Sequence, residues 1–105
     1  MEPTNTITLE EAQDWAGRYR ANPANTIKGY LIPEDDIVQL KDQPDVTDIR
    51  AYMGIDDTGE HKLMLVGVDK EGNDLIDPDN GHYIYDFTTP CPTTCDTKSP
   101  LFSWK

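Results

Sequence analysis

The stretch that decides the fold is VTDIRAYMGIDDTGEHKLMLVGV, residues 46–68 of a 105-residue chain. Its first ten residues alternate between apolar and other side chains, which is typical of a β-strand with one buried face. Four apolar side chains share that face: Ile49, Ala51, Met53 and Ile55. Gly59 ends a polar cluster and can adopt a positive φ at little cost, which predicts a turn. The apolar run at 62–68 predicts a central strand, so the stretch predicts an antiparallel hairpin.

Further short strands and turns follow this hairpin. The segments 69–73 and 77–81 are rich in aspartate, asparagine and glycine, and Asn80-Gly81 is a strong hairpin signal. They predict turns on either side of a short strand at 74–76 and before a last strand at 83–87. Because short turns join only antiparallel neighbours, the segment predicts a meander.

Two helices precede the meander. Thr8 and Glu11 have the spacing of a capping box, which predicts a helix from Leu9 to Ala21 that buries Trp15 and Tyr19. Residues 26–32 are β-rich and predict a strand. Pro33 and the three acids after it predict a second helix start, and Gln43-Pro44 ends that helix. Its buried side is expected to contain three apolar residues: Ile37, Val38 and Leu40.

The expected fold class is α+β, an antiparallel meander sheet of about four to five strands with two helices packed on one face. The length suits a single domain over residues 1–105. We expect residues 1–6 to be flexible. Residues 88–105 contain three prolines and both cysteines, and we expect them to form an irregular tail docked on the domain.

The charge of the chain restricts its partners. Twenty acids and nine bases give a formal net charge of −11. Such a chain repels nucleic-acid phosphates and anionic lipid, so neither is an expected partner. No apolar run approaches the roughly 18 residues of a membrane span. The acidic, polar N-terminus does not resemble a signal peptide, which predicts a cytoplasmic location.

The two cysteines, Cys91 and Cys95, allow three interpretations. A tight turn of this length can bring their Cα atoms within disulfide distance, about 4.4–6.8 Å. A metal site with His82 as a further ligand is the second interpretation, although zinc prefers four ligands and a second cysteine pair is absent from the sequence. Two reduced thiols in a cytosolic protein are the third.

Signatures of catalysis are weak. The sequence contains no G-x-S-x-G elbow, P-loop or dinucleotide glycine fingerprint. The acids of residues 56–86 do not fit the calcium-loop spacing and are typical of solvated turns. A small enzyme that uses Asp56 and Asp57 is one hypothesis, but the sequence favours a non-enzymatic protein, and we expect no cofactor.

Three segments together resemble a known family: IRAYMGIDDTG at 49–59, LMLVGVD with GND at 63–74, and PCPTTC at 90–95. The chain is similar to a family of small uncharacterised bacterial proteins with no assigned activity. The resemblance therefore implies no catalytic or binding residue. It does imply that the Pro-Cys-Pro segment is a feature of the fold.

We therefore expect an acidic interaction or accessory protein that binds a basic partner. The apolar residues near the C-terminus are expected to contact that partner: Leu101, Phe102 and Trp104. The alternative is a small metal- or redox-linked protein that uses Cys91 and Cys95. A homodimer that covers a sheet face or edge is a further expectation.

Overall fold

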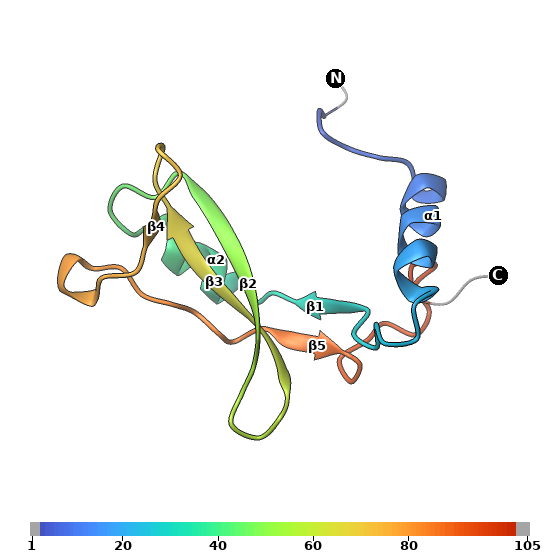
Figure 1. The fold of residues 1–105 in the computed structure, drawn as a ribbon. Coiled ribbons are helices and arrows are strands. Elements are labelled where there is room, and N and C mark those ends of the chain that lie inside the picture. Colours follow the sequence, from blue (N-terminus) through green and yellow to red (C-terminus); the bar gives the residue numbers. More distant parts are fainter. Residues whose placement is uncertain (1–2, 103–105) are drawn as a thin grey trace.

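The computed structural model describes residues 3–102 and has an α+β fold (Figure 1). Two helices and five strands follow one another in this part of the chain, together with one short 3-10 helix. In chain order they are α1 (Leu9–Arg20), β1 (Gly29–Leu31), α2 (Glu34–Lys41), β2 (Asp48–Ile55), β3 (His61–Val68), β4 (Asp74–Leu75), η1 (Pro78–Asn80) and β5 (Thr89–Cys91). All strand pairs are antiparallel, but the strands form two sheets rather than one, β1-β5 and β2-β3-β4.

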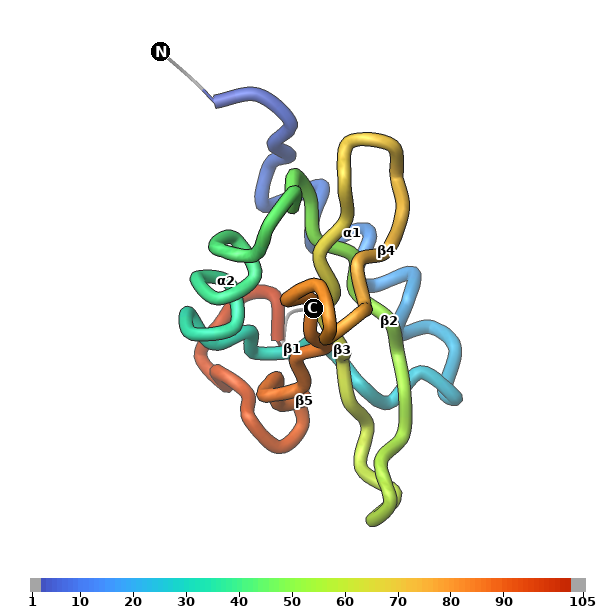
Figure 2. Tube along the Cα trace, turned by 90° about the vertical axis from the view of Figure 1, so that its left-hand side faces the viewer, coloured from blue at the N-terminus to red at the C-terminus, as the bar shows by residue number. Residues whose placement is uncertain are grey.

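The hairpin predicted from residues 46–68 is confirmed. β2 and β3 pair along their whole length, from Asp48 opposite Val68 to Ile55 opposite His61. Gly59 has a φ of +87° in the connecting turn, as its position predicts. The hairpin tip extends away from the rest of the molecule in both views (Figures 1 and 2).

β3 is the central strand, with β2 on one side and a composite edge on the other. β4 pairs with its end, and Leu65 exchanges backbone hydrogen bonds of 2.8 and 3.0 Å with Tyr85. This single bridge is all that forms in place of the strand predicted at 83–87, so that prediction is wrong. The Tyr83 N–H instead donates to the Gln43 side chain at 3.0 Å, which holds the segment without a strand partner.

The core is small. Among the described residues, its buried hydrophobic side chains are Leu40, Leu65, Val66 and Val68. Leu40 comes from α2, which packs on β3, as expected. The prediction that Ile37 and Val38 are buried is wrong, since they are 38% and 47% exposed. The buried positions of α2 are Asp36 and Leu40, four residues apart on one face.

α1 begins as predicted and packs differently. The Thr8 hydroxyl accepts the Glu11 N–H at 3.1 Å and the Glu11 carboxylate accepts the Thr8 N–H at 2.9 Å, so the capping box is confirmed. Trp15 is 53% and Tyr19 45% exposed, so the prediction that α1 buries them is wrong. The reason is position: α1 lies beside the C-terminal segment, away from the three-stranded sheet (Figure 1).

The N- and C-terminal segments meet in the small sheet. β1 is shorter than the strand predicted at 26–32, and it pairs with β5, a strand that the sequence did not indicate. In a two-stranded sheet both strands are edges, which allows Pro90 within β5. The turn at 77–81 is also different from the expected hairpin. It contains η1, capped by Asp77, and Gly81 closes it with a φ of +82°.

The molecule is open for its length. The Cα radius of gyration is 16.0 Å, whereas a compact chain of this length has about 13 Å. The accessible surface is 7992 Å², whereas a compact monomer of this mass exposes roughly 5,900 Å². The excess of about 2,000 Å² is surface that the fold leaves uncovered.

Candidate functional site: an acidic lobe beside a neutral arm

The net charge is confined to one part of the fold. We define the acidic lobe as residues 33–88, which contain α2, the β2-β3-β4 sheet and η1. It holds 15 acids and four bases, a net charge of −11. We define the neutral arm as residues 3–32 and 89–102, which contain α1, β1 and β5 and hold four acids and four bases. The sequence order hides this division because the arm is assembled from both ends of the chain (Figure 1).

Most acids of the lobe have no counter-charge. Nine of its carboxylates are exposed and make no side-chain hydrogen bond or ion pair within the described residues. They are Glu34, Asp35, Asp42, Asp45, Asp48, Asp57, Glu71, Asp79 and Asp86. They come from α2, from β2 and from the loops around the sheet, so the negative field covers the lobe rather than a single point.

Two other acids hold turns of the same design. Asp56 accepts the Thr58 hydroxyl at 2.7 Å and the Glu60 N–H at 2.9 Å, and these bonds lower its pKa. Asp69 accepts the Asn73 and Glu71 N–H groups, each at 2.9 Å, and its pKa is lowered mainly by the bond from Asn73. Both side chains are therefore structural. The Asp56 carboxylate, which one hypothesis assigns to catalysis, is already hydrogen-bonded within its own turn.

A buried polar cluster lies between α2 and the segment 82–88. Asp36, Gln43 and His82 are 3%, 8% and 7% exposed. Gln43 accepts the Tyr83 N–H at 3.0 Å and the Tyr85 hydroxyl at 3.1 Å, and His82 Nε2 lies 2.9 Å from the Pro44 carbonyl. His82 directly follows the turn at 77–81, where a histidine side chain is ordinarily exposed. It is buried because its ring reaches the chain that follows α2.

One oxygen of Asp36 and the amide nitrogen of Gln43 are buried without a hydrogen-bond partner in the described part of the chain. Burial raises the pKa of Asp36, against a hydrogen bond from the Phe87 backbone that lowers it. Sequence analysis missed this cluster. The only signal was position, since Asp36, Leu40 and Gln43 follow helical spacing on the face toward β3.

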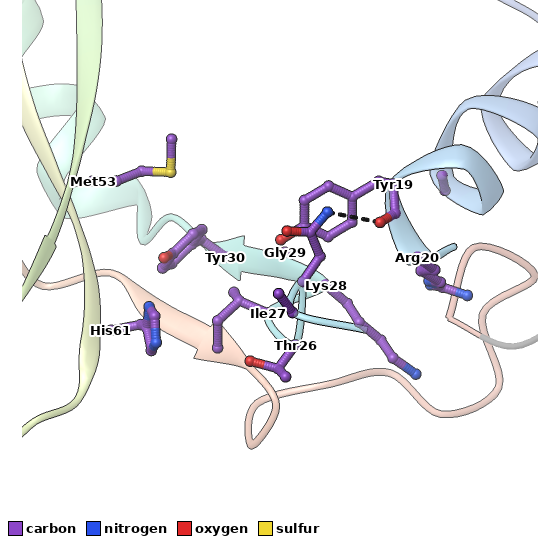
Figure 3. Close-up of a pocket in the computed structure, with 12 residues that line it drawn as sticks. Tyr19, Arg20, Thr26, Ile27, Lys28, Gly29, Tyr30, Met53 and His61 are labelled. Atoms are coloured by element: carbon purple, nitrogen blue, oxygen red, sulfur yellow. Dashed lines mark hydrogen bonds between the residues drawn. The ribbon is translucent and has the colours of Figure 1, made fainter. Parts of the chain in front are cut away.

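An apolar groove separates the two parts of the molecule. It encloses about 440 Å³ between the arm and the turn end of the hairpin. Figure 3 shows Met53 and His61 on the hairpin side, with Ile27 and Tyr30 between them and Tyr19. The lining contains the two basic residues Arg20 and Lys28 and no acid, so the groove has the opposite charge to the acidic lobe.

The cysteines and the tail belong to the arm. Cys91 and Cys95 form a disulfide, with Cα atoms 4.8 Å apart. The Phe102 ring lies 4.0 Å from the Lys28 ammonium, and Leu101 is 42% exposed. Trp104, the third residue expected to contact a partner, lies outside the described residues.

The structure does not bring the proposed metal ligands together. The segment around residue 80 lies at one end of the molecule and β5 lies near its middle (Figure 1), and His82 is hydrogen-bonded to Pro44 rather than placed near the cysteines. Over residues 3–102 no three His, Cys, Asp or Glu side chains form a group suited to a metal ion.

Comparisons with known proteins identify no relative of this chain. No family model matches the chain, and no curated protein or solved structure matches it either. The resemblance to small bacterial proteins therefore stays a prediction. Within the described residues, no helix has the length and apolar character needed to span a membrane.

Proposed function

We propose that this chain is a non-enzymatic interaction or accessory protein whose acidic lobe binds a basic protein partner. One observation carries the proposal, namely the nine exposed carboxylates of the lobe that form no ion pair within residues 3–102. Concentrated like charge opposes folding through self-repulsion. A partner with a basic surface would relieve that repulsion when it binds, and the same field would accelerate its association.

The distribution of the carboxylates supports a broad partner rather than a small ion. They lie on α2, on β2 and on several loops, whereas a metal ion needs oxygens that converge on one point. The sign of the charge opposes binding to nucleic acid and to anionic membranes. The exposed apolar residues of the arm, Leu101 among them, would supply the uncharged part of the contact.

A cytoplasmic location is part of the proposal, and the disulfide is the observation that opposes it. Disulfides are rare in cytosolic proteins because cellular reductants keep thiols reduced. The thiol state of Cys91 and Cys95 in freshly lysed source cells, trapped by alkylation, therefore tests the location.

The test of the main proposal is capture of partners from the source cells at about 0.1 M and 1 M salt, where the screening lengths are about 10 Å and 3 Å. We expect a partner that is retained at low salt and released at high salt. The double variant Glu34→Gln and Glu71→Gln, on the lobe, should weaken retention. The matched variant Glu10→Gln and Asp14→Asn, on the arm, should not. Equal retention at both salt concentrations, or equal effects of the two variants, would overturn the proposal.

A further inference from the structure

Within the described residues 3–102, β2 is an edge strand whose outer backbone N–H and C=O groups have no partner. The sheet order is β2-β3-β4, so β2 has a neighbour on one side only. Leu65 of β3 exchanges its backbone hydrogen bonds with Tyr85, which shows that its N–H and C=O face away from β2. Leu65 is opposite Ala51. Because hydrogen-bonding direction alternates along a strand, the N–H and C=O groups of Ile49, Ala51 and Met53 point outward from the sheet.

This edge lacks the usual features that prevent pairing. β2 is eight residues long and contains no proline or lysine. Exposed apolar side chains accompany the free backbone groups, since Met53 is 83% and Ile49 40% exposed. Natural proteins shorten such edges, charge them or cover them, because an uncovered edge is a template for another strand.

The strand is also the part of the acidic lobe where like charges least oppose association. β2 contains one acid and one base, Asp48 and Arg50, in a lobe whose net charge is −11. Arg50 and Tyr52 both contact Asp74 of β4, so the Arg50 side chain reaches over β3 and leaves the free edge of β2.

We propose that β2 pairs antiparallel with β2 of a second copy of this chain and forms a continuous sheet across a two-fold axis. The amount of uncovered surface supports a copy as the occupant. The excess of about 2,000 Å² per chain is in the range buried by obligate homodimers, about 2,000–5,000 Å² in total for both chains.

The sequence of β2 selects the register. A two-fold axis perpendicular to the sheet places side chains of the same face opposite each other, so an axis at Ala51 pairs Ile49 with Met53 of the other copy. It makes about six main-chain hydrogen bonds from the outward groups of these residues. An axis at Arg50 would place the two Arg50 residues opposite each other, and an axis at Tyr52 would place Asp48 opposite Asp56. Like charges in such positions are unfavourable.

The inference goes beyond the proposed function because it concerns the backbone groups at the β2 edge and another partner. The two also respond differently to salt. Two copies that each carry a charge of −11 repel, so dimerisation should strengthen as salt increases, whereas binding of a basic partner should weaken.

The first experiment measures the mass of the full chain by sedimentation and light scattering at about 1 to 100 µM, because dimerisation depends on protomer concentration. The monomer mass is 11.9 kDa. Ala51→Pro removes an outward N–H and keeps the bonds to β3, and Met53→Lys adds a charge to the edge. Each should raise the dimer dissociation constant at least tenfold. Phe87→Lys is the matched control, because Phe87 is 71% exposed and lies away from the β2 edge.

The second experiment tests the register by mild oxidation of cysteine variants. In the proposed dimer two copies of Ala51→Cys lie about 5.5 Å apart and can form a disulfide. Two copies of Met53→Cys lie about 13 Å apart along the strands and cannot. We expect cross-linked dimer from the first variant only. A chain that stays monomeric at all concentrations, or a dimer unaffected by both edge variants, overturns the inference. Salt-sensitive capture of a basic partner would then still stand on its own.

Discussion

Asp36→Asn is expected to stabilise this protein at neutral pH. Asp36 lies in the first turn of α2 and is 3% exposed. One of its carboxylate oxygens is buried without a hydrogen-bond partner in the described part of the chain. Burial raises its pKa, so the folded state favours the neutral form of this group. An asparagine has a similar shape and is neutral at every pH.

The magnitude follows from two opposing effects. A buried polar group without a partner costs about 1–3 kcal/mol, and more if it is charged. The negative charge of Asp36 near the start of α2 returns about 0.3–1 kcal/mol through the helix dipole, which asparagine would lose. The amide oxygen of asparagine can still accept from the Phe87 backbone, and its NH2 group replaces the unpartnered oxygen, so the substitution removes only the part of the cost that comes from the charge. The expected gain in the free energy of unfolding is therefore about 1 kcal/mol at pH 7.

The gain should depend on pH in one direction. A carboxyl group whose folded pKa is above its ordinary value of 3.8 stabilises the protein fully below that value, and this stabilisation is lost as the pH rises through the folded pKa. The difference between the asparagine variant and the unmodified chain should thus be small near pH 3. It should grow through the acid range and be constant at neutral pH.

The assay is urea denaturation of both proteins between pH 3 and pH 8, followed by circular dichroism. Asp35→Asn is the control, because Asp35 is the neighbouring acid of the same helical turn and is exposed. It should change the free energy of unfolding by less than about 0.5 kcal/mol. If Asp36→Asn destabilises the protein at pH 7, or if its effect has the same pH dependence as that of Asp35→Asn, the description of Asp36 as an uncompensated buried carboxylate is refuted.

Three further perturbations test other parts of the fold. Leu40→Ala should cost about 2–5 kcal/mol in urea denaturation because Leu40 is fully buried, whereas Ile37→Ala on the exposed side of α2 should cost clearly less; equal costs would contradict the observed face of the helix. Gly67→Ala should cost about 1–3 kcal/mol because the added Cβ would lie 2.5 Å from Val46 Cγ2, and an unchanged denaturation midpoint would show that the strand can move there. The disulfide joins cysteines four positions apart, and its reduction should lower the free energy of unfolding by about 2 kcal/mol. A thiol assay in denaturant should detect no thiols before reductant is added and two afterwards. Thiols detected before the reductant would contradict the disulfide.

The hairpin was predictable because its signals are local. The apolar run in β3 and Gly59 act within a few residues, and both agree with the structure. The alternation in β2 predicts the strand correctly, but the prediction of a buried face is wrong, since Ile49, Met53 and Ile55 are 40%, 83% and 66% exposed. The start of α1 was predictable for the same reason, since Thr8 and Glu11 satisfy each other's backbone groups without any tertiary contact.

The wrong predictions concern the tertiary packing of the helices and the pairing of distant strands. The stripe that contains Trp15 and Tyr19 has the spacing of a buried face, but spacing does not show whether a sheet lies opposite. The same limit affected α2, where Asp36 rather than Ile37 is buried. The pairing of β1 with β5 joins residues about 60 positions apart, and no local signal specifies such a contact.

The division into an acidic lobe and a neutral arm could be found only after that pairing was known, because the arm is built from both ends of the chain. It gives the charge of the protein a structural meaning. The lobe has a small core of Leu40, Leu65, Val66 and Val68 and carries the whole net charge, so its folding must oppose both chain entropy and self-repulsion. Pairing at the β2 edge would add buried apolar area, and a basic partner would reduce the repulsion. Because each would stabilise the lobe by a different physical term, folding and association of this protein are expected to be thermodynamically linked.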